Sequence, residues 1–248
     1  MSKVLVIGDS CKDVFIYGDI NRVCPEAPVP VFNPTHQTEN DGMAKNVVRN
    51  LEALGCDVEL ISNNNSIKKI RYVDKRSNQM VLRVDENDIC RSINDEELKR
   101  VEKWGDTFDA VIISDYCKGF LNENDIRYIS SKCNNVFLDT KKFLGEWCEN
   151  INFIKINEFE HKKNFERIPN YPNMVNKLII TQGKKGCTFK ETMFPTEEVP
   201  VKDVSGAGDT FLAGLVCEYM KTKNIKKSIR FAQECTMKVV QKHGVTTI

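Results

Sequence analysis

The sequence predicts an α/β protein in which a mainly parallel central sheet carries helices on both faces. Short apolar runs bounded by polar residues alternate with segments of helical periodicity, which is typical of consecutive β-α-β units. Five of these runs are predicted to be buried strands: residues 4–7, 109–113, 136–138, 151–156 and 178–181. Because parallel strands need a crossover between them, helices are expected in the intervening segments.

Three of the intervening helices have a recognisable start. Asn94 is a candidate N-cap because it precedes acidic residues and an apolar helical face. Asn122 is a second candidate N-cap, for a helix that would end near Cys133. A third helix is expected from Asp209 onward, where apolar residues recur at helical spacing.

Residues 14–33 and 67–86 do not follow this alternation, since they are strand-like but rich in charge. In the second segment polar and apolar residues alternate, as in a strand with one exposed face. We predict that the two segments form a small, half-exposed β-sheet that stands off the main body. Such a sheet could cover a cleft as a lid, or it could provide a dimer surface.

Composition restricts the function classes to be considered. The chain has 248 residues, enough for one large domain, and a net charge of +1, which gives no electrostatic reason to expect nucleic acid or a membrane as a partner. No apolar run is long enough to span a bilayer. Ten cysteines without a CxxC pair and three scattered histidines offer no zinc-ligand spacing, so we expect reduced thiols in a cytoplasmic protein.

The stretch VKDVSGAGDTFLAG, residues 201–214, places small residues directly before a carboxylate at the start of a helix. The N–H groups of a helix N-terminus carry a partial positive charge and favour an anion. A carboxylate at the same place is useful only if it has a separate task beside the bound anion. We therefore expect an anion site at Gly206, Ala207 and Gly208, with Asp209 acting next to it.

Residues 203–214 resemble the C-terminal signature of the PfkB (ribokinase-like) carbohydrate kinases. The resemblance implies a ribokinase-like three-layer α/β/α fold, with residues 1–248 as a single kinase domain and the two charged segments as its lid. It also implies that Asp209 is the catalytic base, and that the preceding N–H groups face the charge that develops on the transferred phosphoryl group. ATP and Mg²⁺ follow as cofactors, with a monovalent cation as a further candidate.

Two motifs of the acceptor side agree with this family in their order along the chain. Gly8-Asp9 followed by Asp13 resembles the early sugar-binding segment, which implies that Asp13 binds sugar hydroxyls. The run DGMAKN, residues 41–46, resembles the N-terminal signature, which implies acceptor contacts from Gly42, Lys45 and Asn46.

Two motifs of the nucleotide side follow. The run NEFE resembles the family's NxxE motif, which implies that Asn157 lies at the nucleotide and that Glu160 lies near Mg²⁺, through water. The run TQGKKG resembles the family's nucleotide loop, which implies that Thr181, Gly183 and Gly186 bind the nucleotide.

The acceptor can be narrowed further by resemblance. Residues 17–31, YGDINRVCPEAPVPV, resemble the first lid strands of the members that phosphorylate O1 of D-glycero-β-D-manno-heptose 7-phosphate. The phosphate of such an acceptor needs a cation, and Arg22, Lys45, Arg71 and Arg83 are candidates. Arg83 is preferred because a fixed arginine inside a strand suits a phosphate fork.

The chain also departs from the family pattern. Met43 stands where the family prefers glycine, and Lys45 where it prefers a small residue. After residues 61–65 the chain enters the second lid segment directly, where relatives usually carry a loop, a helix and a strand, so it resembles a shortened member.

Two alternatives to the heptose kinase stay open: a kinase of another sugar or sugar phosphate, and a catalytically silent sugar- or nucleotide-binding protein. A homodimer joined through the lid is also expected, because the lid sheet would have unpaired, half-apolar edges.

Overall fold

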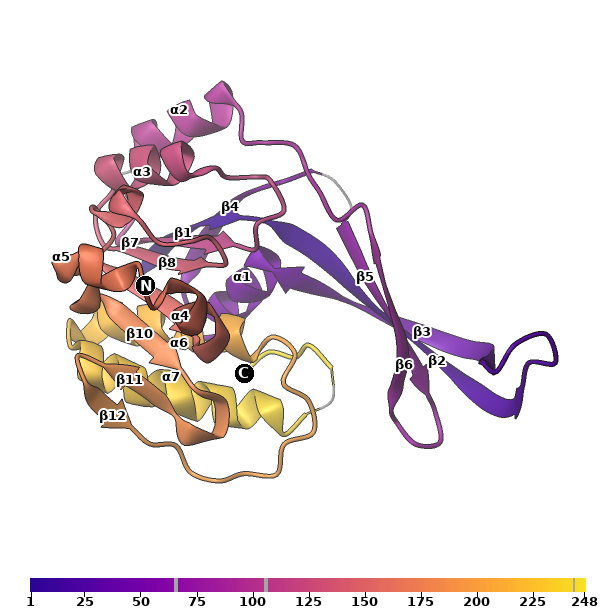
Figure 1. Ribbon diagram of the computed structural model, residues 1–248. Helices are drawn as coiled ribbons and strands as arrows, with labels where there is room; N and C mark the ends of the chain where they lie inside the picture. Colours follow the sequence, from indigo (N-terminus) through magenta and orange to yellow (C-terminus); the bar gives the residue numbers. More distant parts are fainter. Residues whose placement is uncertain (65–66, 105–106, 243) are drawn as a thin grey trace.

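The computed structural model describes residues 1–64, 67–104, 107–242 and 244–248, and this part of the chain forms two sheets of unequal size. The larger sheet lies between two layers of helices, and the smaller sheet projects from one side of the body (Figure 1). This arrangement confirms the predicted three-layer α/β/α fold with a small β lid.

The larger sheet has eight strands in the order β12-β11-β10-β9-β8-β7-β1-β4. The strands from β10 to β4 pair in parallel, whereas β11 and β12 are antiparallel and end one edge of the sheet. Its strands are β1 (Lys3–Gly8), β4 (Asp57–Ser62), β7 (Ala110–Asp115), β8 (Val136–Thr140), β9 (Phe153–Asn157), β10 (Leu178–Thr181), β11 (Cys187–Phe189) and β12 (Thr192–Phe194). Each of the five predicted strands overlaps one of these.

Alternate residues of the central strands bury opposite faces of the sheet. Val4 and Val6 of β1 pack in one cluster with α1, α6 and α7, whereas Leu5 and Ile7 pack in a second cluster with α2, α3 and α5. Because successive side chains of a strand point to opposite faces, one strand packs against the helices of both layers. The helices are α1 (Ala44–Ala53), α2 (Asp95–Trp104), α3 (Glu123–Lys132), α4 (Glu158–Asn164), α5 (Pro172–Val175), α6 (Ala207–Thr222) and α7 (Ile225–Val240), with short 3₁₀ turns at Glu146–Cys148, Ile168–Asn170 and Gly183–Lys185.

The predicted helix starts are present. Asn122 and Asp125 form a reciprocal capping box at α3, and the Asn94 side chain accepts the N–H of Glu97 over 2.9 Å at α2. The third helix, α6, begins at Ala207, two residues before the predicted start, because Gly206 serves as its N-cap with φ 78°. Glycine adopts this left-handed backbone without the strain that a side chain would cause.

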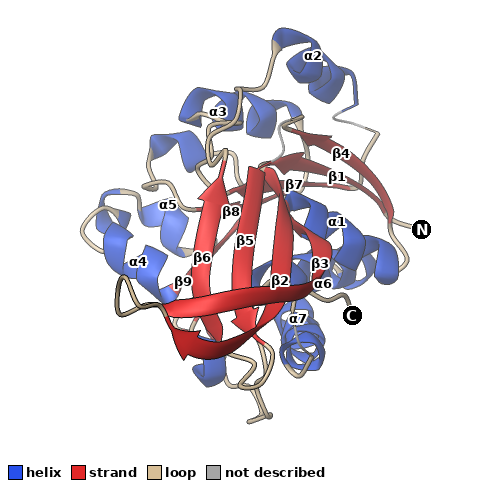
Figure 2. Ribbon diagram, turned by 90° about the vertical axis from the view of Figure 1, so that its right-hand side faces the viewer, coloured by secondary structure: helices blue, strands red, loops and turns tan. Residues whose placement is uncertain are grey.

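The lid is a four-stranded sheet in the order β3-β2-β5-β6, seen face-on in Figure 2. Its strands are β2 (Ser10–Val23), β3 (Pro30–Met43), β5 (Ile67–Asp74) and β6 (Met80–Glu86). β3 continues ten residues past the predicted end of the first lid segment at 33, through a run of polar residues that are mostly exposed. The longer strand matters for function, because its last residues, Gly42 and Met43, enter the body beside α1.

Side-chain packing and a short chain connection both link the lid to the body. Phe15, Val73 and Val245 form a small apolar cluster between the lid and the C-terminal segment, with Tyr17 packed against it. On the other side, β4 ends at Ser62 and β5 begins at Ile67, so the chain passes from the sheet edge to the lid within a few residues. This short connection agrees with the predicted shortening; Asn65 lies outside the described residues.

Other sequence expectations can be checked in the described part of the chain. No helix there is long and apolar enough to cross a membrane. All ten cysteines are free, and the described residues contain no group of three or more His, Cys, Asp or Glu side chains that could hold a metal ion.

Candidate active site

Asp209 lies buried in the first turn of α6, with both carboxylate oxygens hydrogen-bonded. Asn46 of α1 donates its Nδ2 to Asp209 Oδ2 over 2.9 Å, and the Tyr116 hydroxyl donates to Oδ1 over 2.6 Å. Burial raises the pKa of Asp209 to about 6, even though these two hydrogen bonds favour the charged form. The carboxylate is therefore a stronger base than an exposed aspartate, as a proton acceptor near neutral pH requires.

Tyr116 was not singled out from the sequence, but the loop after β7 holds it firmly at Asp209. Its own N–H donates to Asp9 Oδ2 over 2.6 Å, and Asp9 also accepts the N–H groups of Lys118 and Phe120. Two ammonium groups lie over the tyrosine ring, Lys69 at 5.3 Å and Lys141 at 4.8 Å from its centroid. The positive charge of each ammonium group is attracted to the negative electrostatic potential at the face of the aromatic ring.

Asp13 lies on the acceptor side, at the base of the lid. It is 5% exposed and forms a buried ion pair with Arg71 of β5, with 2.5 Å between Oδ1 and Nη1. A Cβ atom on Gly42 would lie 2.0 Å from Asp13 Oδ2, so the absence of a side chain at 42 makes room for this carboxylate. The structure therefore brings Asp13 and Gly42, two of the predicted acceptor residues, together and adds Arg71 as the partner of Asp13.

The predicted anion site at the N-terminus of α6 has a cation beside it. A Cβ atom on Gly208 would lie 2.8 Å from Lys155 Nζ. Lys155, on β9, is buried and donates to Asp139 Oδ2 over 2.6 Å. Burial alone would lower the pKa of Lys155, but the Asp139 carboxylate holds it above its ordinary value. A charged ammonium group thus faces the backbone at Gly208. The sequence did not indicate this role of Lys155, because a lysine within an apolar run is read only as part of a strand.

The predicted nucleotide loop lines a cavity of about 290 Å³. Thr181, Gly183 and Gly186 contribute to it, together with Ala207 of the anion site. Much of the remaining wall is apolar, from the segment before α6 and from α6 and α7: Val199, Val201, Val204, Phe211, Met237 and Val240. An apolar cavity lined in part by the first residue of α6 suits a nucleotide base with its phosphates at that helix N-terminus. The apolar walls were missed because they come from separate segments.

Asn157 and Glu160 form a reciprocal capping box at the start of α4. Glu160 Oε2 accepts the N–H of Asn157 over 2.7 Å, and Asn157 Oδ1 accepts the N–H of Glu160 over 2.9 Å. The second carboxylate oxygen of Glu160 lies 3.6 Å from Lys141 Nζ. The buried Glu160 carboxylate fits an ion held through water, since Mg²⁺ keeps much of its hydration.

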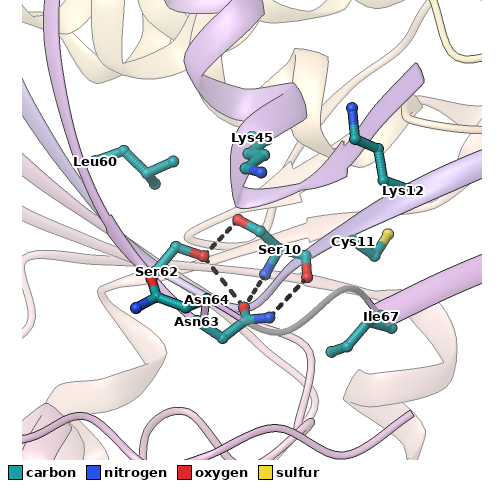
Figure 3. Close-up of a pocket in the computed structure, with 9 residues that line it drawn as sticks. All are labelled: Ser10, Cys11, Lys12, Lys45, Leu60, Ser62, Asn63, Asn64 and Ile67. Carbon is teal, nitrogen blue, oxygen red and sulfur yellow. Dashed lines mark hydrogen bonds between the residues drawn. The ribbon is translucent and has the colours of Figure 1, made fainter. Parts of the chain in front are cut away.

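The two remaining predicted acceptor residues lie on β6 of the lid and on α1. Arg83, on the edge strand β6, is 41% exposed and forms a two-pronged pair with Asp85, at 2.7 and 2.8 Å. Lys45 lies in the first turn of α1 and lines a second cavity at the base of the lid (Figure 3). Met43, the N-cap of α1, has φ 59° and ψ −133°, a backbone conformation that glycine adopts more easily.

The fold and this constellation define a kinase of the ribokinase-like type, and comparison with known proteins gives the family. The sequence model of the pfkB family carbohydrate kinases matches residues 94–248. This is more than half of the chain, and the chain belongs to that family.

The more specific similarity is to proteins named "Bifunctional protein HldE". The protein of this name from a Nitratiruptor species is 30% identical over 292 positions, covering 99% of this chain and 63% of the relative. The one from Helicobacter acinonychis (strain Sheeba) is 27% identical, covering 98% and 64%. The chain thus spans slightly under two thirds of the length of these relatives. The first alignment is 44 positions longer than the chain, so the relative carries residues within the aligned part that this chain lacks.

Solved structures support the fold. A nucleoside kinase from Methanocaldococcus jannaschii, described as an archaeal member of the ribokinase family, superposes with a TM-score of 0.71 at 19% identity, covering 99% of this chain and 93% of that one. Phosphofructokinase-2 from Escherichia coli, in complex with potassium, gives 0.75 at 13% identity, covering 99% and 94%.

Proposed function

We propose that the protein is an ATP-dependent sugar kinase that transfers a phosphoryl group to a sugar hydroxyl. The observation that carries this proposal is the position of Asp209. Its carboxylate is buried with a raised pKa, adjoins the N-terminus of α6, and is held by Asn46 and Tyr116. The apolar cavity lies on the side of Ala207, and Asp13 lies toward the lid.

In the proposed reaction the acceptor sugar lies between Asp13 and Asp209. Each carboxylate oxygen of Asp209 has a second lone pair, so it can accept the acceptor hydroxyl while Asn46 and Tyr116 stay bound. Asp209 takes the proton as the hydroxyl oxygen bonds to the γ-phosphorus, and the bond to the bridging oxygen of the leaving ADP breaks. Lys155 and the N–H groups at Gly206, Ala207 and Gly208 stabilise the charge on the transferred group.

Mg²⁺ is the proposed cofactor. When bound, it neutralises the phosphate charges of the nucleotide and helps to orient them. Glu160 is the residue proposed to hold it, through water, and Asn157 fixes the Glu160 carboxylate through the capping box. A monovalent cation stays a proposal supported only by resemblance, alongside the potassium complex of the phosphofructokinase-2.

The proposed acceptor is O1 of D-glycero-β-D-manno-heptose 7-phosphate. The resemblance of residues 17–31 and the similarity to the HldE proteins both support this choice. The alternative acceptor is another sugar or sugar phosphate. A catalytically silent protein is the alternative that the departures at Met43 and Lys45 favour, whereas the complete Asp209 site favours catalysis.

Coupled detection of ADP release across a panel of sugars and sugar phosphates tests the proposal. We expect the highest kcat/KM with the heptose 7-phosphate, and phosphorus NMR should show a new phosphate on O1. Release of ADP with another sugar would support a kinase but reject this acceptor. No acceptor-dependent ADP release with any sugar of the panel would reject the kinase.

We also propose a homodimer joined through the lid. Met80, Val81 and Leu82 of the lid's edge strand β6 are all more than 40% exposed. An exposed apolar strand edge tends to be covered by another chain. Sedimentation at micromolar concentration should give a dimer, and a monomer in wild-type protein would count against it.

A further inference from the structure

A cavity of about 380 Å³ lies beside the acceptor side of the site, where β2, α1 and the ends of β4 and β5 meet (Figure 3). Six of its lining side chains are polar: Ser10, Lys12, Lys45, Ser62, Asn63 and Asn64. Each of these can donate a hydrogen bond, and none of the described lining residues is acidic. We propose that this cavity binds the phosphate monoester group of the acceptor, an inference that rests on the sugar-kinase function proposed above.

The cavity adjoins the acceptor side of the site at Cys11. Cys11 lines it, and the Cys11 Sγ lies 3.9 Å from Asp13 Oδ2. Lys45 lines it from α1, directly before Asn46, which holds Asp209. In the proposed binding mode a sugar at Asp13 presents one hydroxyl to Asp209, and its other end extends past Cys11 into the cavity. The volume is typical of small-molecule sites and exceeds what a lone ion needs.

The cavity offers two ammonium groups with N–H donors that can meet a phosphate. Lys12 Nζ lies 3.1 Å from Asp41 Oδ1 at a partly exposed pair, and an ammonium group has two further N–H donors. Lys45 has no ion pair with any described residue, and the first turn of α1 contains no acidic residue. Arg83 differs, because it does not line the cavity and its Nε and Nη2 are already bound to Asp85. The lysines are therefore better placed than the arginine preferred from the sequence.

The wall opposite the lysines is rigid. Ser10 donates its N–H to Asn63 Oδ1 over 2.7 Å, and the Ser62 hydroxyl donates to Ser10 Oγ over 2.6 Å; Figure 3 shows this network facing Lys45 across the cavity. Ordered polar groups lower the entropy that ligand binding removes. Part of the cavity wall comes from β4, an edge strand of the described sheet.

The kinetic test compares Lys45→Ala and Lys12→Ala with Lys99→Ala, which removes an exposed lysine of α2 outside the cavity. With heptose 7-phosphate, kcat/KM should fall about 10- to 100-fold in each cavity variant, since hydrogen bonds to charged groups are the stronger ones. With the unphosphorylated heptose, kcat/KM of the cavity variants should change less than about 3-fold. Lys45→Arg should recover part of the loss seen with heptose 7-phosphate. Lys99→Ala should behave as wild type with both sugars. Equal losses with both sugars, or a phosphate-specific loss only in Arg83→Ala, would overturn the proposal.

A labelling test is independent of activity, so it separates a failure of this proposal from a failure of the kinase function. Pyridoxal 5′-phosphate carries a phosphate monoester and an aldehyde that condenses with a lysine amine, releasing water; borohydride then reduces the imine. With a non-hydrolysable ATP analogue filling the nucleotide side, Lys45 or Lys12 should be labelled, and heptose 7-phosphate should protect where free heptose does not. No labelling of either lysine would overturn the proposal. The proposal would also be overturned if inorganic phosphate at the same concentration protected the lysines and Lys45→Ala had unchanged kinetics. Those two results together would indicate a site for free phosphate.

Discussion

The hydrogen bond from Tyr116 to Asp209 makes a prediction about the pH dependence of catalysis. Tyr116→Phe removes the hydroxyl that lies 2.6 Å from Asp209 Oδ1 and keeps the aromatic ring that Lys69 and Lys141 approach. That hydroxyl favours the charged carboxylate, so its loss should raise the pKa of Asp209 above its value of about 6. A hydrogen bond to a charged group contributes about 1.5 kcal/mol or more, which corresponds to about one pKa unit.

The sign follows from the role of the base. Asp209 must be deprotonated to accept the hydroxyl proton, so activity should fall as the pH drops through its pKa. In wild type the acidic limb of kcat/KM, which reports the free enzyme, should lie near pH 6, and in Tyr116→Phe it should move about one unit higher, with kcat/KM at high pH reduced much less. The assay is ADP release at acceptor concentrations well below KM across pH 5–9. Tyr128→Phe, an exposed tyrosine of α3, is the control and should keep the wild-type profile. An unshifted limb in Tyr116→Phe would refute the assignment of Tyr116 to the carboxylate of the base.

Three further predictions concern the framework of the site. Gly206→Ala should lower kcat strongly, because the new Cβ would lie 2.6 Å from Asn46 Nδ2. Gly55 has a similar φ of 82° but open space where a Cβ would lie, so Gly55→Ala is the control. It should lower the free energy of unfolding by about 1–2 kcal/mol and leave kcat unchanged. Equal kcat in the two variants would contradict this reasoning. Arg71→Ala should lower the free energy of unfolding by about 3–5 kcal/mol, since it leaves the Asp13 carboxylate buried without its partner. Arg83→Ala removes a more exposed ion pair and should lower it by under about 1 kcal/mol. Similar losses of the two variants in urea denaturation would reject this difference between the buried and the exposed ion pair. Gly186→Ala should raise the KM for ATP more than the KM for sugar, because a Cβ there would lie 2.0 Å from the carbonyl oxygen of Phe194, and an unchanged KM for ATP would remove this turn from the nucleotide site.

The architecture was largely predictable because local patterns dictate it. The alternation of apolar runs and helical segments located five strands of the main sheet, and short polar caps such as Asn122 located helix starts. The predicted first lid segment ended too early, at residue 33 instead of 43, because residues 33–41 of β3 are polar and mostly exposed. They pair with β2 through the backbone, so the sequence shows no alternation of apolar and polar residues there.

The site was predictable only where its residues are adjacent in sequence. The run from Gly206 to Asp209 is local, and its geometry follows from a glycine-rich helix start. Tyr116, by contrast, meets Asp209 across 93 positions, and Lys155 reaches Gly208 from another strand. Such contacts depend on which strands become neighbours in the sheet, which no local pattern specifies.

The most direct test of the proposed function is the turnover of Asp209→Asn with heptose 7-phosphate and ATP. The substitution keeps the shape of the side chain and removes the proton acceptor, so kcat should fall by at least ~10²-fold. Nucleotide affinity, measured by calorimetry, should stay within a few-fold of wild type, because the apolar cavity and the anion site are unchanged. Turnover within a few-fold of wild type would contradict the role of Asp209 as the catalytic base.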